Sequence, residues 1–258
     1  MLLSILTMSL EVEQTMLINM LTNIIHLPGL RGNPERQYPL TNWDDTFPGT
    51  FEKYAASVLH GWQERNQPEM LAEVEADLVD LDLAHKVRAR AKDGTSVEVE
   101  IKPGSDSVEV VSLADVGLGV SQCLPVVVAL HVAKPNQLVY LEQPEIHLHP
   151  RAQVKLASVL ARAVRRGVRM IVETHSDHLL LGIQTLVGEG QLTPPDVGLN
   201  WFQHDAQQRS TRIHSADINE AGGFGDWPED FSEVDMESRT AYLDAVAARR
   251  RKAAAAAT

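Results

Sequence analysis

Two apolar runs of the chain each end in side chains that could bind a ligand. Residues 138–141 lead into Glu142, and about thirty residues later the run 170–172 leads into a polar segment that contains His175. A short apolar run bounded by turn signals predicts a buried parallel strand. In open α/β sheets ligands bind at the carboxyl ends of the strands. Adjacent parallel strands would therefore place Glu142 and His175 at one edge of a sheet.

A glycine-containing loop forms a second candidate binding element. Gly117, Gly119 and Ser121 precede the apolar stretch 123–132, which predicts a long helix. The first turn of a helix presents backbone N–H groups and the positive end of its dipole, and glycines let the backbone approach an anion closely. A phosphate contact and a plain capped helix start both fit this loop.

The histidines around the two strand ends allow a third interpretation, a metal-dependent hydrolase. A His-x-His pair and a later His-x-x-His pair have donor types that can bind zinc. The residues concerned are His147, His149, His175, Asp177 and His178.

Helices, a hairpin and a further strand pair must position these groups. The pattern predicts two helices over 51–80 broken near Pro68, a hairpin over 86–101 turning at Asp93-Gly94, a helix over 151–166 ending at Gly167, and two strands within 198–217. A helix is also expected over 1–25 and another in the tail up to residue 247. The acidic residues of the second helical stretch predict a solvated face: Glu69, Glu73, Glu75, Asp77, Asp80 and Asp82.

The loop 26–36 is rich in proline and glycine, and its Arg31 and Arg36 could contact a phosphate or a carboxylate or simply lie at the surface. Four further arginines, predicted to be solvated at helix ends, are Arg162, Arg165, Arg166 and Arg169.

Composition limits the class of protein. The 258 residues carry a net charge of -12, which argues against a surface that binds nucleic acid or anionic membranes throughout. The single cysteine, Cys123, excludes an internal disulfide framework and is predicted to be a small core residue. No run approaches the roughly 18 apolar residues of a membrane span, and the amino terminus lacks a secretion signal pattern. We expect a cytoplasmic protein without membrane contact.

The order of these segments resembles the carboxyl-terminal half of an ABC-type ATPase head. The residues that carry the resemblance are the glycine loop before a helix, the strand ending in Glu142-Gln143-Pro144-Glu145 with its His-rich loop, and the strand followed by His175. The similarity is greatest to prokaryotic AAA-like ABC ATPases related to the OLD family, kin to SMC heads and frequent in anti-phage defence operons. It implies an α/β fold with a mostly parallel sheet flanked by helices, plus an N-terminal helical and β-hairpin region.

The resemblance assigns roles to individual residues. Gly117, Gly119, Ser121 and Gln122 match the signature loop, which contacts the γ-phosphate bound to the opposite subunit of a head dimer. Glu142 matches the Walker B acid that holds Mg²⁺, an oxygen-ligated hard cation. Residues 144–149 match the D-loop, and His175 matches the switch histidine that senses the γ-phosphate.

Two departures limit the implied activity. Gln143 stands where many relatives place a catalytic glutamate, and an amide cannot accept a proton, so Glu145 is the nearest candidate base. No Gly-x-x-x-x-Gly-Lys-Ser/Thr occurs in the sequence, so the backbone cradle and lysine that hold the β- and γ-phosphates are not supplied. We expect the Walker A half to lie on another polypeptide, with ATP and Mg²⁺ shared between the two.

The expected organisation has four parts: a helical region over 1–84, a hairpin region over 85–111, an ABC-like core over 112–235 and a tail over 236–258. The implied partners are a second head, identical or different, a chain with a Walker A motif, and a nuclease or toxin effector, with nucleic acid contacted through the partner. A scaffold that keeps the ABC shape without catalysis is the alternative.

Overall fold

The computed structural model describes residues 22–44, 46–205, 209–225 and 240. The expected helix over 1–25 therefore falls almost entirely outside the described residues, as do the tail helix and the basic terminus. The chain divides into two compact units, Met1–Leu186 and Val187–Thr258.

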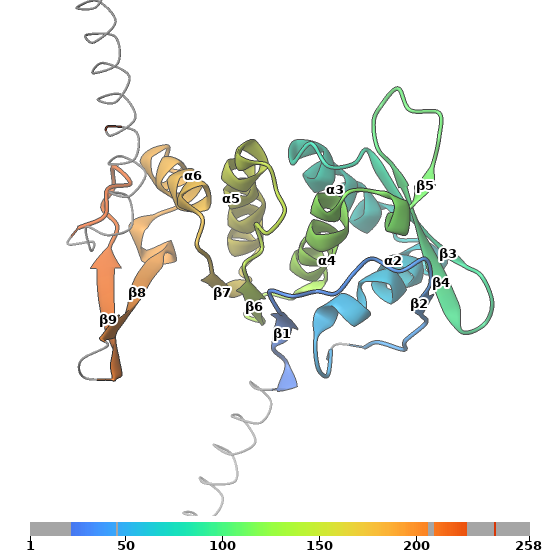
Figure 1. The fold of residues 1–258 in the computed structure, drawn as a ribbon, viewed down its shortest axis with the longest axis horizontal. Helices are drawn as coiled ribbons and strands as arrows, with labels where there is room; N and C mark the ends of the chain where they lie inside the picture. The colour runs from blue at the N-terminus through green and yellow to red at the C-terminus, as the bar shows by residue number, and fades with distance from the viewer. Residues whose placement is uncertain (1–21, 45, 206–208, 226–239, 241–258) are drawn as a thin grey trace, which may run out of the picture. The chain divides into compact units, whose positions relative to one another are not determined.

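The first unit is built around a parallel sheet of three strands (Figure 1). They are β1 (Ile25–Leu27), β6 (Leu138–Glu142) and β7 (Arg169–Glu173), in the order β1-β6-β7. Leu27 pairs with Leu141, and Glu142 pairs with Glu173. The prediction that the two apolar runs form adjacent parallel strands is confirmed. Their carboxyl ends lie at one edge.

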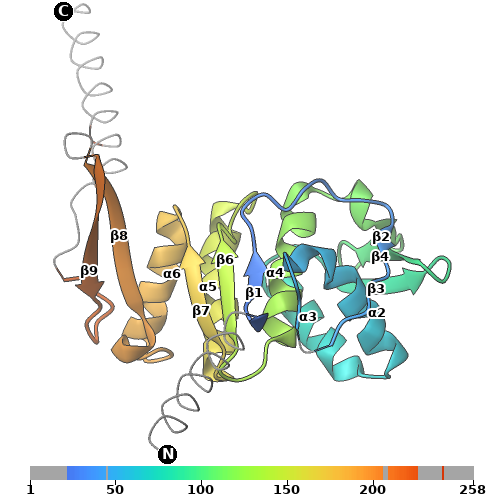
Figure 2. The ribbon, with the colours of Figure 1, turned by 90° about the horizontal axis from the view of Figure 1, so that it is seen from below.

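Helices α4 (Leu118–Val132), α5 (Pro150–Arg165) and α6 (Asp177–Gly188) lie along one face of this sheet, as Figure 2 shows from below. Helix α4 is apolar around its whole circumference and is buried from Ser121 to His131. Helix α5 is amphipathic, starts with Pro150 at its first position and is followed by Gly167 at φ 86°. Only glycine adopts that left-handed conformation without strain, so the predicted helix end at Gly167 is confirmed.

Among the described residues, α4, α5 and α6 cover one face of the sheet. Burial alternates along the strands: Val139 and Leu141 of β6 are buried, while their neighbours in β6 are half-buried. In β7 the alternation leaves Arg169, Ile171 and Glu173 exposed. The prediction of a buried second strand is therefore wrong for Arg169, Ile171 and Glu173, because the described helices α4, α5 and α6 pack on the other face of the sheet.

The helical and hairpin region packs beside α4 in the same unit. Proline at the first position of α3 separates the two predicted helices, and an antiparallel sheet of order β2-β4-β3, with β5 on β4, contains the predicted hairpin. The elements are β2 (Tyr38–Pro39), η1 (Phe51–Lys53), α2 (Ala55–Glu64), α3 (Pro68–Asp80), β3 (Lys86–Ala91), β4 (Ser96–Lys102), β5 (Val111–Ser112) and η2 (Leu113–Asp115).

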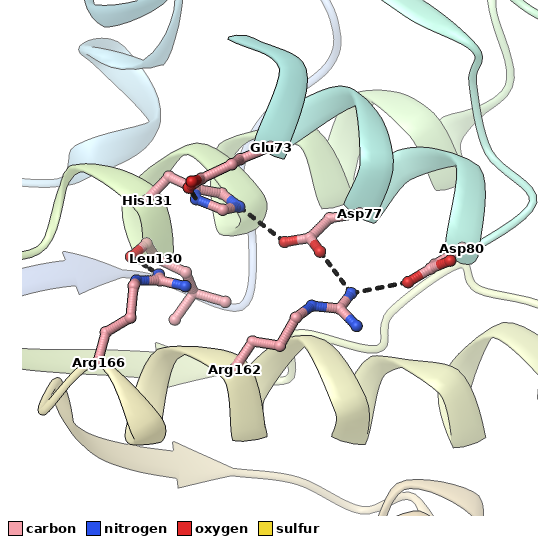
Figure 3. Close-up of polar contacts among 7 residues, drawn as sticks. All are labelled: Glu73, Asp77, Asp80, Leu130, His131, Arg162 and Arg166. Atoms are coloured by element: carbon pink, nitrogen blue, oxygen red, sulfur yellow. Dashed lines mark hydrogen bonds and ion pairs between the residues drawn. The ribbon is translucent and has the colours of Figure 1, made fainter. Parts of the chain in front are cut away.

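One member of the predicted solvated acidic face is buried. Asp77 is 4% exposed, and its carboxylate contacts His131 Nε2 at 2.7 Å and the guanidinium of Arg162 (Figure 3). Asp80 adds a second carboxylate to Arg162 at 3.0 Å. The prediction that Asp77 lies on a solvent-exposed helix face is therefore wrong. Helices α4 and α5 place His131 and Arg162 against its carboxylate.

The second unit contains η3 (Pro194–Asp196) and the antiparallel pair β8 (Gly198–Asp205) and β9 (Ser210–Asp217). This pair confirms the two strands expected within 198–217. Among the described residues no helix is long and apolar enough to cross a membrane.

Candidate functional site

Glu142 is the last residue of β6, and two groups from the neighbouring chain segment hold its carboxylate. His26 Nε2 lies 2.8 Å from Oε1, and the backbone N–H of Gly29 donates to Oε2 at 3.0 Å. The Gly29 hydrogen bond first, and the His26 contact second, lower the pKa of Glu142 below its ordinary value. The side chain is 29% exposed, so an ionised, oriented carboxylate remains accessible at the edge of the sheet.

His26 is itself held in place by an aromatic contact. Its ring stacks on that of Tyr140 with centroids 5.0 Å apart and 9° between the planes. The two residues are partners in the β1–β6 register. Neither His26 nor Gly29 was identified as a site residue from the sequence, because their role depends on pairing with a strand more than a hundred residues away.

The loop after β6 turns sharply at Gln143, whose φ is 43°. The backbone N–H of Gln143 donates to Glu173 O at 2.8 Å, which extends the pairing of β6 with β7 by one residue. This geometry places Gln143 directly beside the end of the neighbouring strand.

Glu145, the predicted alternative base, points into the protein. It is 7% exposed, and its Oε1 accepts hydrogen bonds from Thr174 Oγ1 at 2.6 Å and His175 N at 3.2 Å. Its Oε2 is buried without a hydrogen-bond partner. Glu145 therefore joins the loop after β6 to the segment after β7.

His175 lies two residues beyond the end of β7, with an exposed side chain and a backbone anchored by Glu145. Ser176 directly precedes α6 and caps it: its Oγ accepts from Leu179 N at 3.0 Å and donates to Gln153 Oε1 at 2.7 Å. The structure thus brings Glu142, Gln143 and Glu145 to the same edge as His175.

The predicted signature residues lie at the start of α4, but two of their side chains are turned inward. Ser121 and Gln122 are each 6% exposed. Ser121 Oγ donates to Leu118 O at 3.1 Å, and Gln122 Nε2 donates to Gly32 O at 2.7 Å. Of the four predicted signature residues, Gly117, at the N-cap position, is the exposed one.

Gly119 marks a close approach between this helix start and the loop after β6. A Cβ atom at position 119 would lie 3.1 Å from the carbonyl oxygen of His147. The helix that the resemblance assigns to the signature therefore packs directly against the segment that it assigns to the D-loop.

Arg31 connects α4 with the end of β6. Its Nη1 donates to Gln122 O at 3.1 Å, and its Nη2 donates to the carbonyl oxygens of Glu142 at 2.8 Å and Gln143 at 3.1 Å. The residue is 8% exposed, and burial lowers the pKa of its guanidinium. The second loop arginine, Arg36, instead binds the Asp115 carboxylate through both terminal nitrogens, at 2.9 and 2.6 Å.

A cavity of about 560 Å³ lies beside this connection. The loop 30–41, the start of α2 and the first half of α4 line it, and Arg31 and Gln122 form part of its wall. Glu142 is not among its lining residues, so the cavity is separate from the edge where that carboxylate lies.

The histidines that could have bound zinc do not form a metal-binding cluster. Within the described residues no three His, Cys, Asp or Glu side chains are arranged to hold a metal ion. His149 instead caps α5 by accepting a hydrogen bond from Arg151 N at 3.3 Å.

Comparison with protein families decides where the chain belongs. Residues 20–181, more than half of the sequence, match the family described as "AAA domain, putative AbiEii toxin, Type IV TA system". The chain is a member of this AAA-domain family. No curated protein sequence matches the chain.

Solved structures similar to this AAA-domain chain are heads of SMC proteins. The Smc head bound to the C-winged helix domain of ScpA has 11% sequence identity and a TM-score of 0.49, and the match covers 66% of this chain and 51% of that chain. A structure from work on ATP-driven dimerization and DNA-stimulated activation of SMC ATPases has 12% identity, a TM-score of 0.47 and coverages of 70% and 96%. The Smc head domain with coiled coil and joint from Pyrococcus yayanosii has 12% identity, a TM-score of 0.48 and coverages of 70% and 31%. The AAA-domain chain thus spans about half of the first of these structures.

At the carboxyl edge of the parallel sheet, the Glu142 carboxylate has the chemistry of a Mg²⁺ ligand. Glu142 offers ionised carboxylate oxygens, the donor type that Mg²⁺ prefers, and each oxygen has more lone-pair positions than its present contact uses. The 258-residue sequence contains no Gly-x-x-x-x-Gly-Lys-Ser/Thr motif.

Proposed function

We propose that this chain is the Walker B half of an ABC-type ATPase head, and that it acts with a partner that supplies the phosphate-binding loop. One observation carries the proposal. Glu142 is ionised, oriented by His26 and Gly29, and lies at the same sheet edge as the exposed His175. Membership in the AAA-domain family supports it.

In this proposal Glu142 would hold Mg²⁺ and His175 would contact the γ-phosphate. Bound Mg²⁺ would supply charge compensation for the phosphates. The exposed backbone at Gly117 and the first turn of α4 would meet the phosphate of a nucleotide on a second head. The inward side chains of Ser121 and Gln122 leave this contact to the backbone of the helix start.

Arg31 connects the start of α4 to the end of β6 through hydrogen bonds. It binds the backbone carbonyl oxygens of Gln122 and Glu142 together, so a displacement of the helix start would also move the backbone that carries the carboxylate. A second head that docks on α4 would in this way influence the metal site.

Neither Gln143 nor Glu145 offers the proposed ATPase an exposed carboxylate that could take a proton from the attacking water. Gln143 can orient a water but cannot take its proton, and Glu145 is buried and hydrogen-bonded to Thr174. We therefore propose slow hydrolysis, with a nucleotide that clamps the heads together for most of the cycle.

ATP binding tests the proposal. The chain would be purified alone and together with a neighbouring gene product that carries a Walker A motif, and Mg²⁺-ATP binding would be measured by calorimetry. We expect tight binding by the complex only, and Glu142→Gln in the complex should weaken the magnesium dependence. Tight Mg²⁺-dependent binding by the isolated chain, or a stable complex that ignores ATP, would overturn it.

We further propose an anti-phage defence or DNA-transaction complex as the setting, with nucleic acid contacted through the partner. The family description, with the words "putative AbiEii toxin, Type IV TA system", supports a role in such a system. Protection of cells against phage, compared between the operon with the natural chain and the operon with Glu142→Gln, tests this role.

The burial of Glu145 and the amide at Gln143 favour a second candidate, a scaffold that holds a nuclease or toxin without hydrolysing ATP. The double variant Glu142→Ala, His175→Ala separates the two. Unchanged activity of an intact complex would establish the scaffold, and loss of activity with intact assembly would exclude it.

A further inference from the structure

Two groups of opposite charge line the cavity of about 560 Å³, and each has an atom without a partner. Arg31, from the loop after β1, and Glu52, from η1, both contribute to the cavity wall. Arg31 Nε and Glu52 Oε2 are buried, and neither has a hydrogen-bond partner among the described residues. Buried polar atoms in native proteins are paired with protein groups, with water or with a ligand. These two atoms therefore mark a place where a further molecule binds.

The remaining atoms of both side chains are already bound. The terminal nitrogens of Arg31 donate to backbone oxygens at the start of α4 and at the end of β6, which fixes the position of the guanidinium. Glu52 Oε1 accepts a hydrogen bond from Thr50 Oγ1 at 2.5 Å. Burial lowers the pKa of Arg31, and the charge of Glu52 is among those that oppose this lowering. The two groups thus act on each other through space, while Nε and Oε2 stay available to a third molecule.

The rest of the cavity wall is mostly apolar. Val99, Leu113 and Leu124 line it and are each at most 4% exposed. Water could bind the two polar atoms, but it finds no hydrogen-bond partners along such walls. Leu30, which is 88% exposed, and the exposed Lys53 also line the cavity, so it is accessible to solvent on their side. Small-molecule sites combine an apolar interior with a few polar groups in this way.

The two charges select the class of ligand. An anion alone would pair with Arg31 but would bring a negative charge toward Glu52, and a cation alone would do the reverse. A molecule that carries both charges, together with an apolar body, matches both groups and the wall. An α-amino acid with an apolar side chain is the simplest zwitterion of this kind.

We propose that this cavity binds a small zwitterion of that class. Its carboxylate would accept from Arg31 Nε, its ammonium would donate to Glu52 Oε2, and its apolar part would lie against Leu113 and Leu124. The inference is independent of the proposed ATPase, because neither Glu142 nor His175 lines the cavity.

Binding of free amino acids to the full chain tests the proposal. L-Leucine, L-methionine and L-phenylalanine would each be titrated into the purified protein, with calorimetry to measure affinity and ¹H–¹⁵N NMR to locate the site. We expect at least one of them to bind with a dissociation constant of about 1 mM or tighter and to shift the Nε–H signal of Arg31. No binding by any of the three at about 10 mM, or binding that leaves this signal unchanged, would overturn the proposal.

Analogues with a single charge separate a zwitterion site from a general apolar pocket. For the amino acid that binds most tightly, the matched acid lacks the ammonium and the matched amine lacks the carboxylate; for L-leucine these are 4-methylpentanoate and 3-methylbutylamine. We expect each analogue to bind at least about tenfold more weakly than the amino acid. An analogue with the same affinity would contradict the pairing with both Arg31 and Glu52.

A substitution at Glu52 provides a second measurement. Glu52→Gln keeps a side-chain oxygen for Thr50 but removes the charge that would pair with the ammonium, so we expect at least about a tenfold loss of affinity for the amino acid. Glu64→Gln, at the exposed end of α2 and outside the cavity wall, is the matched control and should leave the affinity unchanged. Circular dichroism checks that both variants fold. Equal affinities of the two folded variants would show that Glu52 does not bind the ligand and would refute the proposed site.

Discussion

Glu142 has its charge and its orientation because of two groups on the segment around the end of β1. The Gly29 N–H and His26 each contact one carboxylate oxygen, and both favour the ionised form. A folded-state pKa below the ordinary 4.5 means that this carboxylate stabilises the fold above that pH. The contribution is lost as the pH falls through the lowered pKa.

Replacement of His26 tests this assignment. In His26→Ala the pKa of Glu142 should rise toward its ordinary value but not reach it, because the Gly29 hydrogen bond, the larger cause, remains. Carbon-13 NMR titration of labelled glutamates measures the pKa, with Glu142→Gln to identify the signal. His60→Ala on α2 is the matched histidine control. An unchanged pKa in His26→Ala would show that His26 does not act on Glu142.

Cys123 illustrates how burial suppresses reactivity. It is fully buried in α4, as the sequence predicted, and burial raises its pKa from 9.0 to about 12. We expect the thiolate fraction at pH 8 to be about a thousandfold lower in the folded chain than in urea, with alkylation slowed accordingly. The rate of iodoacetamide modification in the two states measures this. Equal rates would mean that α4 opens readily.

At the scale of elements, the helices that cover the sheet are joined by close backbone contacts and by one polar network. At Gly182 of α6 an added Cβ would lie 2.5 Å from Val154 O and 2.7 Å from the Ala157 Cβ on α5. The network joins α3, α4 and α5 through Asp77, His131 and Arg162 (Figure 3). These contacts set the spacing of the layer behind the site.

Gly182→Ala should destabilise the fold by about 1–3 kcal/mol, because α5 and α6 must move apart. Alanine's better helix propensity, about 1 kcal/mol, offsets only part of this cost. Leu181→Ala, one residue earlier and 54% exposed, should change stability by no more than about 0.5 kcal/mol. Urea unfolding of both variants measures the difference. A more stable Gly182→Ala would contradict the close contact.

Asp77→Ala should cost about 3 kcal/mol, since it leaves the buried His131 and the guanidinium of Arg162 without their shared carboxylate. Asp80→Ala removes a carboxylate whose side chain is 57% exposed, so we expect about 0–1 kcal/mol. Thermal and urea unfolding compare the two. Equal losses would show that the buried carboxylate is no more important than the exposed one.

At the scale of the whole molecule, the first unit combines two parts: a parallel sheet with α4, α5 and α6 on one face, and the helical and hairpin region beside α4. All the groups of the candidate site lie in this unit: the carboxyl ends of β6 and β7, the loop after β1 and the start of α4. Two of the arginines that could contact nucleic acid already bind groups within this unit. Arg162 binds the carboxylate of Asp77, and Arg166 donates to Leu130 O.

The net charge of -12 predicts that the chain alone binds duplex DNA weakly. We expect dissociation constants no tighter than the nonspecific range of about 10⁻⁴ to 10⁻⁶ M at physiological salt. Fluorescence anisotropy with labelled duplex measures this for the chain alone and for its complex with the partner. Tighter binding by the isolated chain would contradict contact through the partner only.

The sequence by itself predicted the parallel pair, the edge with Glu142 and His175, the hairpin and the helix ends. These features depend on local periodicity and on turn residues such as Gly167, which act over a few positions. The positions of Glu145 and Asp77 were not predictable in this way, because both are surrounded by groups from distant elements.

Only the tertiary structure decided what holds the site together. The pairing of β1 with β6 brings His26 and Gly29 to Glu142, and the course of the following loop brings Arg31 to both Glu142 and Gln122. It also decided that Arg169, Ile171 and Glu173 of β7 are exposed in the part of the chain that the structure describes. The physical reason is that a strand's apolar pattern predicts that it is buried, but which segment covers each face depends on contacts between residues far apart in the chain.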